Sequence, residues 1–255
     1  MGEDAPDDGA GVSAFTLIRP EGQGGFVLLC DHASNHVPAE LKRLGLPPSD
    51  LDRHIAWDIG ASGVAMRLSE LLDAPAIVCG ASRLVIDCNR HPDAGDLIPA
   101  ISDKTPIPGN RALSEAQRAA RIERWFTPYH QAVDSVLAAQ AALGRLPMVL
   151  SIHSMTMRMD GVLRPWRIAL SSHHDRRFVE PMLAALRRPG DIMVGDNQPY
   201  DLDPAVDFSI PYHAMRRNLP YLQVEFRQDE VIDPAGQERW ARRFATALAE
   251  ALPVT

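Results

Sequence analysis

Residues 26–36 read FVLLCDHASNH, an apolar run of five residues followed directly by polar side chains that include a histidine. A second apolar run, Met148–Ile152, leads into His153, and a third, Tyr221–Val224, leads into Glu225. Short apolar runs of this kind are typical of strands buried inside a sheet. In open α/β sheets, functional groups gather where strands end. The three runs therefore predict one site shared by two histidines and a glutamate.

Segments with helical patterns alternate with these strands. Apolar residues recur at helical spacing over residues 59–72, and a capping pattern of Ser114 with Gln117 opens a helical stretch that reaches Leu143. Pro128 inside that stretch predicts a kink or a break. The alternation predicts a single α/β domain with a central mixed, mostly parallel sheet flanked by helices. Further expected strands are Phe15–Arg19, Pro75–Cys79, Leu84–Asp87, Ile168–Ser171 and Asp191–Val194, and further expected helices are 38–44, 178–186 and 234–252.

Composition and charge narrow the class of protein. The chain has 255 residues, of which 45% are hydrophobic, enough for one sizeable core. Its formal net charge of -7 disfavours binding to nucleic acid or to an anionic membrane, and no apolar run has the length of a membrane span. Residues 1–14 are expected to be a disordered tail without the apolar segment of a signal peptide, followed by one domain over 15–255. The three cysteines form no disulfide framework, so a cytoplasmic location is expected.

His32 and His153 are the candidate metal ligands. They lie far apart in the sequence, so the prediction requires their strands to be neighbours in the sheet. A catalytic zinc usually has three protein ligands and one position for water, which leaves a carboxylate to be found. Asp58 is the first candidate, and Asp31 and Asn35 are weaker ones. Each histidine could instead be an inert polar residue at a strand end, and Asp58 a helix cap.

Glu225 is the candidate general acid and base. A glutamate that follows a mostly apolar strand must be paired or lie near a metal, because an isolated buried charge is costly. A metal in surroundings of low polarity would adjust the proton affinity of this carboxyl for proton transfer. The alternative is an ion pair with Arg227 or another arginine.

Arginines are the candidates for binding an anionic substrate. Arg83 and Arg90 lie in the segment SRLVIDCNR at residues 82–90, on either side of an expected strand. A guanidinium can bind a carboxylate through two parallel hydrogen bonds. Arg164, shortly after the second histidine, would add a further contact. Each arginine could also be a solvated surface charge. Together with the histidines, these arginines predict a small anionic substrate beside a metal.

Six short motifs occur in order along the chain. They are DHASNH (31–36), HIAWDIG (54–60), DCNR (87–90), SIHSMT (151–156), GDNQPY (195–200) and EFRQD (225–229). From about Val27 to about Val231, this series resembles the N-formylglutamate amidohydrolase family. That family is similar to zinc-dependent exopeptidases and aspartoacylases. The resemblance therefore implies a zinc-exopeptidase-like fold, of the phosphorylase/hydrolase-like kind.

The resemblance also implies roles for single residues. His32 and His153 match the metal-binding histidines of those enzymes, and Glu225 matches their acid and base. Asn89 and Arg90 match the last two residues of an Asp-Leu-Asn-Arg motif that binds the substrate carboxylate.

One position departs from the wider pattern. The related enzymes have a metal-binding glutamate three residues after the first histidine, where this chain has Asn35. An amide oxygen is a poor zinc ligand beside a carboxylate. This departure is the reason for proposing Asp58 as the third ligand.

These inferences predict an amidohydrolase that depends on a divalent metal, with zinc expected. Its substrate would be a small anionic N-acyl amino acid, with an N-formyl or another short acyl group. Glu225 would take the proton of a metal-activated water and pass it to the leaving amine. Tyr200 and His213, in loop-like segments, would line the pocket or stabilise the oxyanion. The residues expected to contact the substrate are Arg83, Asn89, Arg90, Arg164, Tyr200 and His213.

Two other functions remain open from the sequence. Ser154 could be the nucleophile of a metal-free hydrolase, although no Gly-x-Ser-x-Gly motif surrounds it. The chain could also be a non-catalytic ligand-binding module on an amidohydrolase scaffold, since Asn35 replaces an expected ligand. Sensitivity to a chelator separates the first alternative from a metalloenzyme, and metal analysis with an assay for released formate separates the second.

Overall fold

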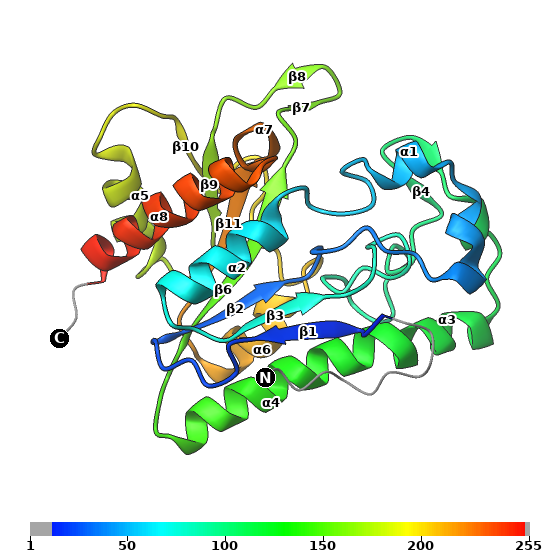
Figure 1. Ribbon diagram of the computed structural model, residues 1–255, viewed down its shortest axis with the longest axis horizontal. Coiled ribbons are helices and arrows are strands. Elements are labelled where there is room, and N and C mark those ends of the chain that lie inside the picture. Colours follow the sequence, from blue (N-terminus) through cyan, green and yellow to red (C-terminus); the bar gives the residue numbers. More distant parts are fainter. Residues whose placement is uncertain (1–11, 253–255) are drawn as a thin grey trace.

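The computed structural model describes residues 12–252. Its centre is a sheet of seven strands in the order β1-β3-β2-β6-β11-β9-β10 (Figure 1). The strands are β1 (Phe15–Ile18), β2 (Phe26–Cys30), β3 (Ala76–Cys79), β6 (Met148–Met155), β9 (Ile168–Ser171), β10 (Val194–Asp196) and β11 (Tyr221–Arg227).

Four neighbouring strands in the middle of the sheet, β3, β2, β6 and β11, run parallel. At one edge β1 runs antiparallel to β3, and on the other side β9 runs antiparallel to β11 and parallel to β10. The expected single-domain α/β fold with a mixed, mostly parallel sheet is thereby confirmed. Two short hairpins lie outside the sheet, β4 (Ile101–Ser102) with β5 (Thr105–Pro106) and β7 (Arg158–Met159) with β8 (Val162–Leu163).

Helices cover both faces of the sheet (Figure 1). One face carries α2, α5 and α8, whose apolar side chains share a buried cluster with the strands. On that face Phe226 of β11 contacts Trp240 and Phe244 of α8, with ring centroids 6.1 and 5.8 Å apart. The other face carries α4. The helices are α1 (Pro48–Leu51), α2 (Ala61–Leu71), α3 (Glu115–Arg121), α4 (Thr127–Ala142), α5 (Val179–Arg187), α6 (Ser209–His213), α7 (Gln228–Val231) and α8 (Pro234–Ala251), with short 3₁₀ turns at Ala39–Gly45, Pro108–Asn110 and Met215–Arg217.

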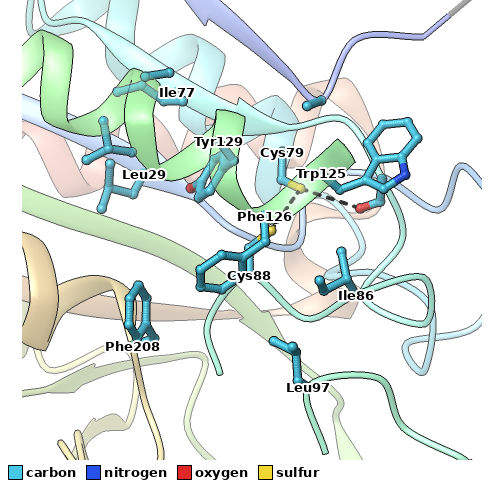
Figure 2. Close-up of a cluster of buried hydrophobic side chains, with 14 of the residues drawn as sticks. Leu29, Ile77, Cys79, Ile86, Cys88, Leu97, Trp125, Phe126, Tyr129 and Phe208 are labelled. Atoms are coloured by element: carbon cyan, nitrogen blue, oxygen red, sulfur yellow. Dashed lines mark hydrogen bonds between the residues drawn. The ribbon is translucent and has the colours of Figure 1, made fainter. Parts of the chain in front are cut away.

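The second face of the sheet packs around Tyr129 of α4. Figure 2 shows this cluster, in which Leu29 and Ile77 from the strands lie near Tyr129 and Phe126. Phe208 packs against Phe126 with ring centroids 5.2 Å apart. Every second side chain of a strand points to this face of the sheet. Where these side chains change from apolar to polar along the strand, the apolar cluster ends. The site described below occupies that position.

The long helical stretch after Ser114 is continuous to Ala142, and its regular α-helical geometry is interrupted just before Pro128. The expected capping box is present, since Ser114 accepts from the Gln117 N–H and the Gln117 side chain accepts from the Ser114 N–H. A π-helical turn at Ile122–Phe126 joins α3 to α4. Pro128 lies in the first turn of α4, directly after this π-helical turn.

Two expected strands differ in the structure. Leu84–Asp87 forms turns, because the Ser82 hydroxyl accepts from the Leu84 N–H and the Ser82 carbonyl accepts from the Val85 N–H. The strand expected at Asp191–Val194 begins only at Val194 and ends at Asp196. The other expected strands agree closely, and Phe26–Cys30 and Ile168–Ser171 have the expected bounds.

The expected tail over residues 1–14 lies outside the described residues except for its last three positions. Of these, Ala14 is buried and its carbonyl accepts from the Gly80 N–H. Over residues 12–252, no helix combines the length and the apolar character that crossing a membrane requires. All three cysteines are buried and free.

Candidate metal and substrate site

Three adjacent strands bring the predicted residues together. His32 lies two residues after the end of β2, and His153 and Glu225 lie within the last three residues of β6 and β11. The order β2-β6-β11 makes these strands neighbours, and Glu225 is paired in register with His153. The expected adjacency of the histidine strands is therefore present. The strands extend through these polar residues because the residues next to them, such as Ile152 and Val224, point to the opposite face and are buried in the core.

His32, Asp58 and His153 form the candidate metal centre. Each offers one ligand atom, and these atoms lie within 4.8 Å of one another. Asp58 Oδ2 lies 2.8 Å from Nδ1 of His153 and 3.4 Å from Nδ1 of His32. All three side chains are buried. Asp58 enters this cluster from the segment before α2, where its N–H donates to the His32 carbonyl at 2.9 Å.

Polar groups behind the two histidines fix their rings. Nε2 of His32 lies 2.7 Å from Oδ1 of Asp87. Nε2 of His153 lies 2.9 Å from the Ser151 hydroxyl and 3.5 Å from Oδ2 of Asp31. Ligand histidines usually direct their second ring nitrogen to such a partner, which leaves the first free to bind metal. Here the Nε2 atoms contact these partners and both Nδ1 atoms face Asp58, as expected for two ligand histidines.

The donors suit a zinc ion. Histidine and aspartate ligands about 2.0–2.2 Å from a tetrahedral zinc lie roughly 3.3 Å from each other. The contact of Asp58 Oδ2 with Nδ1 of His32, at 3.4 Å, matches this value, whereas its contact with Nδ1 of His153, at 2.8 Å, is shorter and has the length of a hydrogen bond. Burial opposes ionisation of Asp58, but the charges and hydrogen bonds of His32 and His153 hold its pKa below the usual value. A deprotonated carboxylate is the form that binds a metal.

The structure separates Asp58 from the two weaker candidates for the third ligand. Asn35 directs its amide away from the cluster, because its Nδ2 donates to the Leu51 carbonyl at 3.1 Å. Asp31 lies behind His153, where its Oδ1 accepts from Tyr129 at 2.8 Å and from Ser209 at 2.7 Å. Only Asp58 of these three joins the described His/Asp cluster.

Glu225 lies beside this cluster with a free oxygen. Its Oε2 is buried and has no hydrogen-bond partner among residues 12–252. Burial raises the pKa of Glu225 to about 7, although the charge of His153 opposes this shift. A carboxyl that binds and releases a proton near neutral pH suits a general acid and base. Among residues 12–252, no arginine lies within ion-pair distance of Glu225, and Arg227 binds Asp229, with Nε–Oδ1 at 2.7 Å.

A cavity of about 330 Å³ opens over these residues. Its wall combines the cluster and Glu225 with many of the predicted substrate contacts. Arg83, Asn89, Arg90 and Tyr200 line it, together with His32, Asp58, His153 and Glu225.

The arginines around the cavity are already engaged. Arg83 binds Asp87 through Nε and Nη2, at 3.1 and 2.7 Å, and its Nη1 lies 3.4 Å from Asp58. Asp87 therefore joins Arg83 to His32. Arg164 is buried behind the wall, where its Nη2 donates to the Tyr200 hydroxyl at 2.8 Å and its Nη1 to Thr156 at 3.1 Å. Arg164 does not line the cavity, but both of its partners do.

Two other candidates lie elsewhere or are otherwise engaged. His213 is fully buried outside the cavity wall, between His130 at 2.8 Å and Asp134 at 3.0 Å. Ser154 lines the cavity, but its hydroxyl donates to the Ile59 carbonyl at 2.8 Å and accepts from Gln228 at 3.3 Å. Within residues 12–252 no histidine nitrogen is hydrogen-bonded to that hydroxyl. The part of the chain that the structure describes therefore places no base in hydrogen-bond contact with Ser154.

The cavity also contains residues that were not predicted. Asp207 binds Asn89, with Oδ1 3.0 Å from Nδ2. Gln223 is buried on the same face of β11 as Glu225, and its Oε1 has no partner among the described residues. His54 also lines the cavity. The period of two along β11 could have identified Gln223, whereas no local pattern links Asn89 to Asp207.

Comparisons with known proteins agree with this geometry. A family model described as N-formylglutamate amidohydrolase matches residues 24–232. A gene product of Agrobacterium tumefaciens of known crystal structure is 33% identical, with a TM-score of 0.92, over 96% of this chain and 97% of that one. An N-formylglutamate amidohydrolase from Ralstonia eutropha is 20% identical, with a TM-score of 0.62, over 93% and 96%, and supports the fold. A search of curated protein sequences finds no match.

Proposed function

Because this chain belongs to the N-formylglutamate amidohydrolase family, we propose that it removes a formyl or another short acyl group from the nitrogen of an amino acid. Membership of the family makes it a hydrolase of a linear amide, and it confirms the resemblance of the six motifs. The proposal adds a divalent metal, with zinc favoured, held by His32, Asp58 and His153.

One observation carries the proposal. The three candidate donors lie within 4.8 Å of one another in a buried cluster, with the partnerless oxygen of Glu225 beside them. A structural ion pair would leave no such oxygen, since buried polar atoms are normally paired. The contacts of Asp87 and Ser151 with the histidines also support a metal site, because they occupy the Nε2 atoms and both Nδ1 atoms face Asp58.

The residues of the chain divide the work of hydrolysis. A bound zinc ion would polarise the amide carbonyl and lower the pKa of a nearby water. Glu225 takes the proton of the attacking water on its free oxygen and delivers it to the nitrogen of the leaving amine. Arg83, fixed by Asp87, lies at the cavity wall where it can stabilise negative charge on the acyl oxygen.

The polar cavity wall favours an amino-acid substrate. Asn89, Arg90 and Tyr200 line the cavity, and Arg164 holds the Tyr200 hydroxyl. A guanidinium and an amide N–H at a wall suit a carboxylate. A small anionic N-acyl amino acid is therefore the proposed substrate, and N-formyl-L-glutamate is the first to test.

The test is a panel of N-formyl, N-acetyl and longer N-acyl amino acids, assayed with added zinc and by release of the free amine. We expect hydrolysis of at least one short N-acyl amino acid, lost on full metal removal and restored by zinc. Ser154→Ala is the matched control, and it should retain metal-dependent activity.

Full activity after metal removal would contradict the metal-dependent mechanism. A purified protein that binds zinc but hydrolyses no member of the panel would instead support a ligand-binding module.

A further inference from the structure

A carboxylate of the protein itself occupies the pair formed by Asn89 and Arg90. Oδ1 of Asp207 accepts from Nδ2 of Asn89 at 3.0 Å and lies 3.5 Å from Nη1 of Arg90. Its other oxygen, Oδ2, accepts from the Asp203 N–H at 3.0 Å. Asp207 lines the cavity, with its side chain 12% exposed. It presents to this pair the same chemical group that an amino-acid substrate would present.

The orientation of Asn89 is fixed by the same segment. Its Oδ1 accepts from the N–H groups of Phe208 and Ser209, both at 3.0 Å. This leaves Nδ2 as the only end of the amide that faces Asp207. An amide nitrogen carries two hydrogens, so one remains for a substrate once Asp207 has taken the other.

The charge of Arg90 is also already balanced. Its Nε donates to Asp96 at 3.1 Å, and its Nη1 donates to the Asn89 carbonyl at 2.9 Å. One guanidinium therefore faces two carboxylates, those of Asp96 and Asp207. A substrate carboxylate bound here would be a third negative charge around a single positive one. Burial raises the pKa of Asp207, which agrees with a carboxylate in a poorly solvated position.

We propose that Asp207 is a specificity-determining residue that competes with the substrate carboxylate for Asn89 and Arg90. This inference rests on the proposed function, because it concerns how the same cavity receives an N-acyl amino acid. A substrate carboxylate must displace Oδ1 of Asp207 from Asn89 or bind beside its charge. In either case Asp207 raises the KM of substrates that carry a carboxylate at this position, relative to those with a neutral amide there.

Asp207→Asn tests the competition because it keeps the size of the side chain and an oxygen for Asn89, but removes the charge. We expect the KM of N-formyl-L-glutamate to fall roughly fivefold. The KM of the same compound with its α-carboxylate converted to an amide should stay within about twofold. Asp207→Ala should also lower the KM of the acid and leave the KM of the amide within about twofold. Thermal unfolding verifies that both variants are folded.

Asp96→Asn is the matched control. Asp96 binds the same guanidinium, but it is 62% exposed and does not line the cavity. This variant removes one charge near Arg90 without releasing Asn89. We expect its KM for N-formyl-L-glutamate to stay within about twofold of the unaltered protein.

Calorimetric titration with glutarate, with its neutral diamide for comparison, needs no turnover. Tighter glutarate binding by Asp207→Asn supports the competition even if no N-acyl amino acid is hydrolysed, a result that would refute the proposed function alone. Unchanged or weaker glutarate binding, together with an unchanged or higher KM for N-formyl-L-glutamate, overturns the role of Asp207. An equal change for the acid and its amide would also overturn it, because a structural effect does not distinguish the two.

Discussion

At Glu225 one buried oxygen has no hydrogen-bond partner among residues 12–252, and burial raises the pKa of this carboxyl to about 7. Its neighbour in register is His153, one of the three candidate metal ligands. A carboxyl in this position has no structural partner to lose at Oε2. Its replacement by an amide is therefore expected to alter chemistry more than folding.

Glu225→Gln should retain zinc and lose turnover, because an amide cannot accept the proton of water. The expected fall in kcat is about 10²–10⁴-fold. Zinc content measured by mass spectrometry and steady-state kinetics test this together. Glu238→Gln, on α8 outside the cavity wall, serves as the control. Turnover at the unaltered rate would assign the proton transfer to another group.

Asp87 supports the metal centre through His32. Its Oδ1 lies 2.7 Å from Nε2 of that ring, and Arg83 holds its other oxygen. Asp87→Asn should weaken zinc binding by about 10–100-fold, because the ring loses the partner that orients it. Competition with a chromophoric chelator measures the affinity. Asp93→Asn, at an exposed position nearby, should have no effect, and equal affinities in all three proteins would exclude the orienting role.

Single residues of the candidate site were predictable where a strand pattern delivered them. The apolar runs before His153 and Glu225 placed both residues on the sheet, and the structure pairs them. The hydrogen bond between Asn89 and Asp207 joins residues 118 positions apart, and no local pattern encodes it. His213 was expected at the pocket because its segment resembled a loop, but it lies in α6 and is fully buried.

At the level of elements, the strands and long helices follow from hydrophobic periodicity. The expected strand Leu84–Asp87 failed because the hydroxyl and carbonyl of Ser82 bind the next N–H groups and turn the chain. β6 and β11 extend beyond their apolar runs, since only one face of each strand becomes polar at the cavity. A prediction from apolar content alone therefore ends such strands several residues before their observed ends.

The capping box of α3 is expected to stabilise the folded protein. Ser114→Ala removes the acceptor for the Gln117 N–H and should lower the free energy of unfolding by about 1 kcal/mol. Denaturant titration followed by circular dichroism measures the change. Ser135→Ala, within α4, is the matched control and should be nearly neutral, because the Ser135 hydroxyl only donates to the Gln131 carbonyl one turn earlier. Equal losses in both variants would mean that the cap contributes nothing specific.

For the whole molecule, the sequence could predict a mixed sheet but not its strand order. The antiparallel pairing of β9 with β11 depends on the path of the chain through residues 156–167, which carry no pattern for direction. The sequence also could not predict that α6 lies against α4, where His213 contacts His130. These two histidines link distant elements and respond to acid together.

Burial lowers the pKa of His130 to about 3. Burial and then the charge of Arg217 lower that of His213 to about 3. An unfolded histidine titrates near pH 6.5, so between about pH 6.5 and about pH 3 the unfolded chain binds protons that the folded chain does not. Stability from this source is complete above that range and falls as the pH drops through it. Asp134, which faces His213 at 3.0 Å, and Arg217 are the charged groups at the end of the pair.

The free energy of unfolding should therefore fall between pH 7 and pH 5, by up to roughly 2 kcal/mol for each buried histidine. Urea titrations at the two pH values measure this loss. A His130→Gln, His213→Gln double variant should lose less stability over the same interval, although it is less stable at pH 7. His174→Gln, at an exposed position, should lose as much as the unaltered protein. A loss of equal size in the double variant would show that the folded pair binds a proton.

The β7–β8 hairpin projects away from the sheet (Figure 1), and Thr156 and Arg164 lie at its two ends. The hydrogen bond from Nη1 of Arg164 to Thr156 closes its base, so its tip at Asp160 and Gly161 is not part of the cavity wall. Chain insertions are best tolerated at exposed tips of this kind. A fluorophore on a residue inserted between positions 160 and 161 would be joined through this hairpin to Thr156, which lines the cavity, and could convert the arrival of a small molecule into an optical signal.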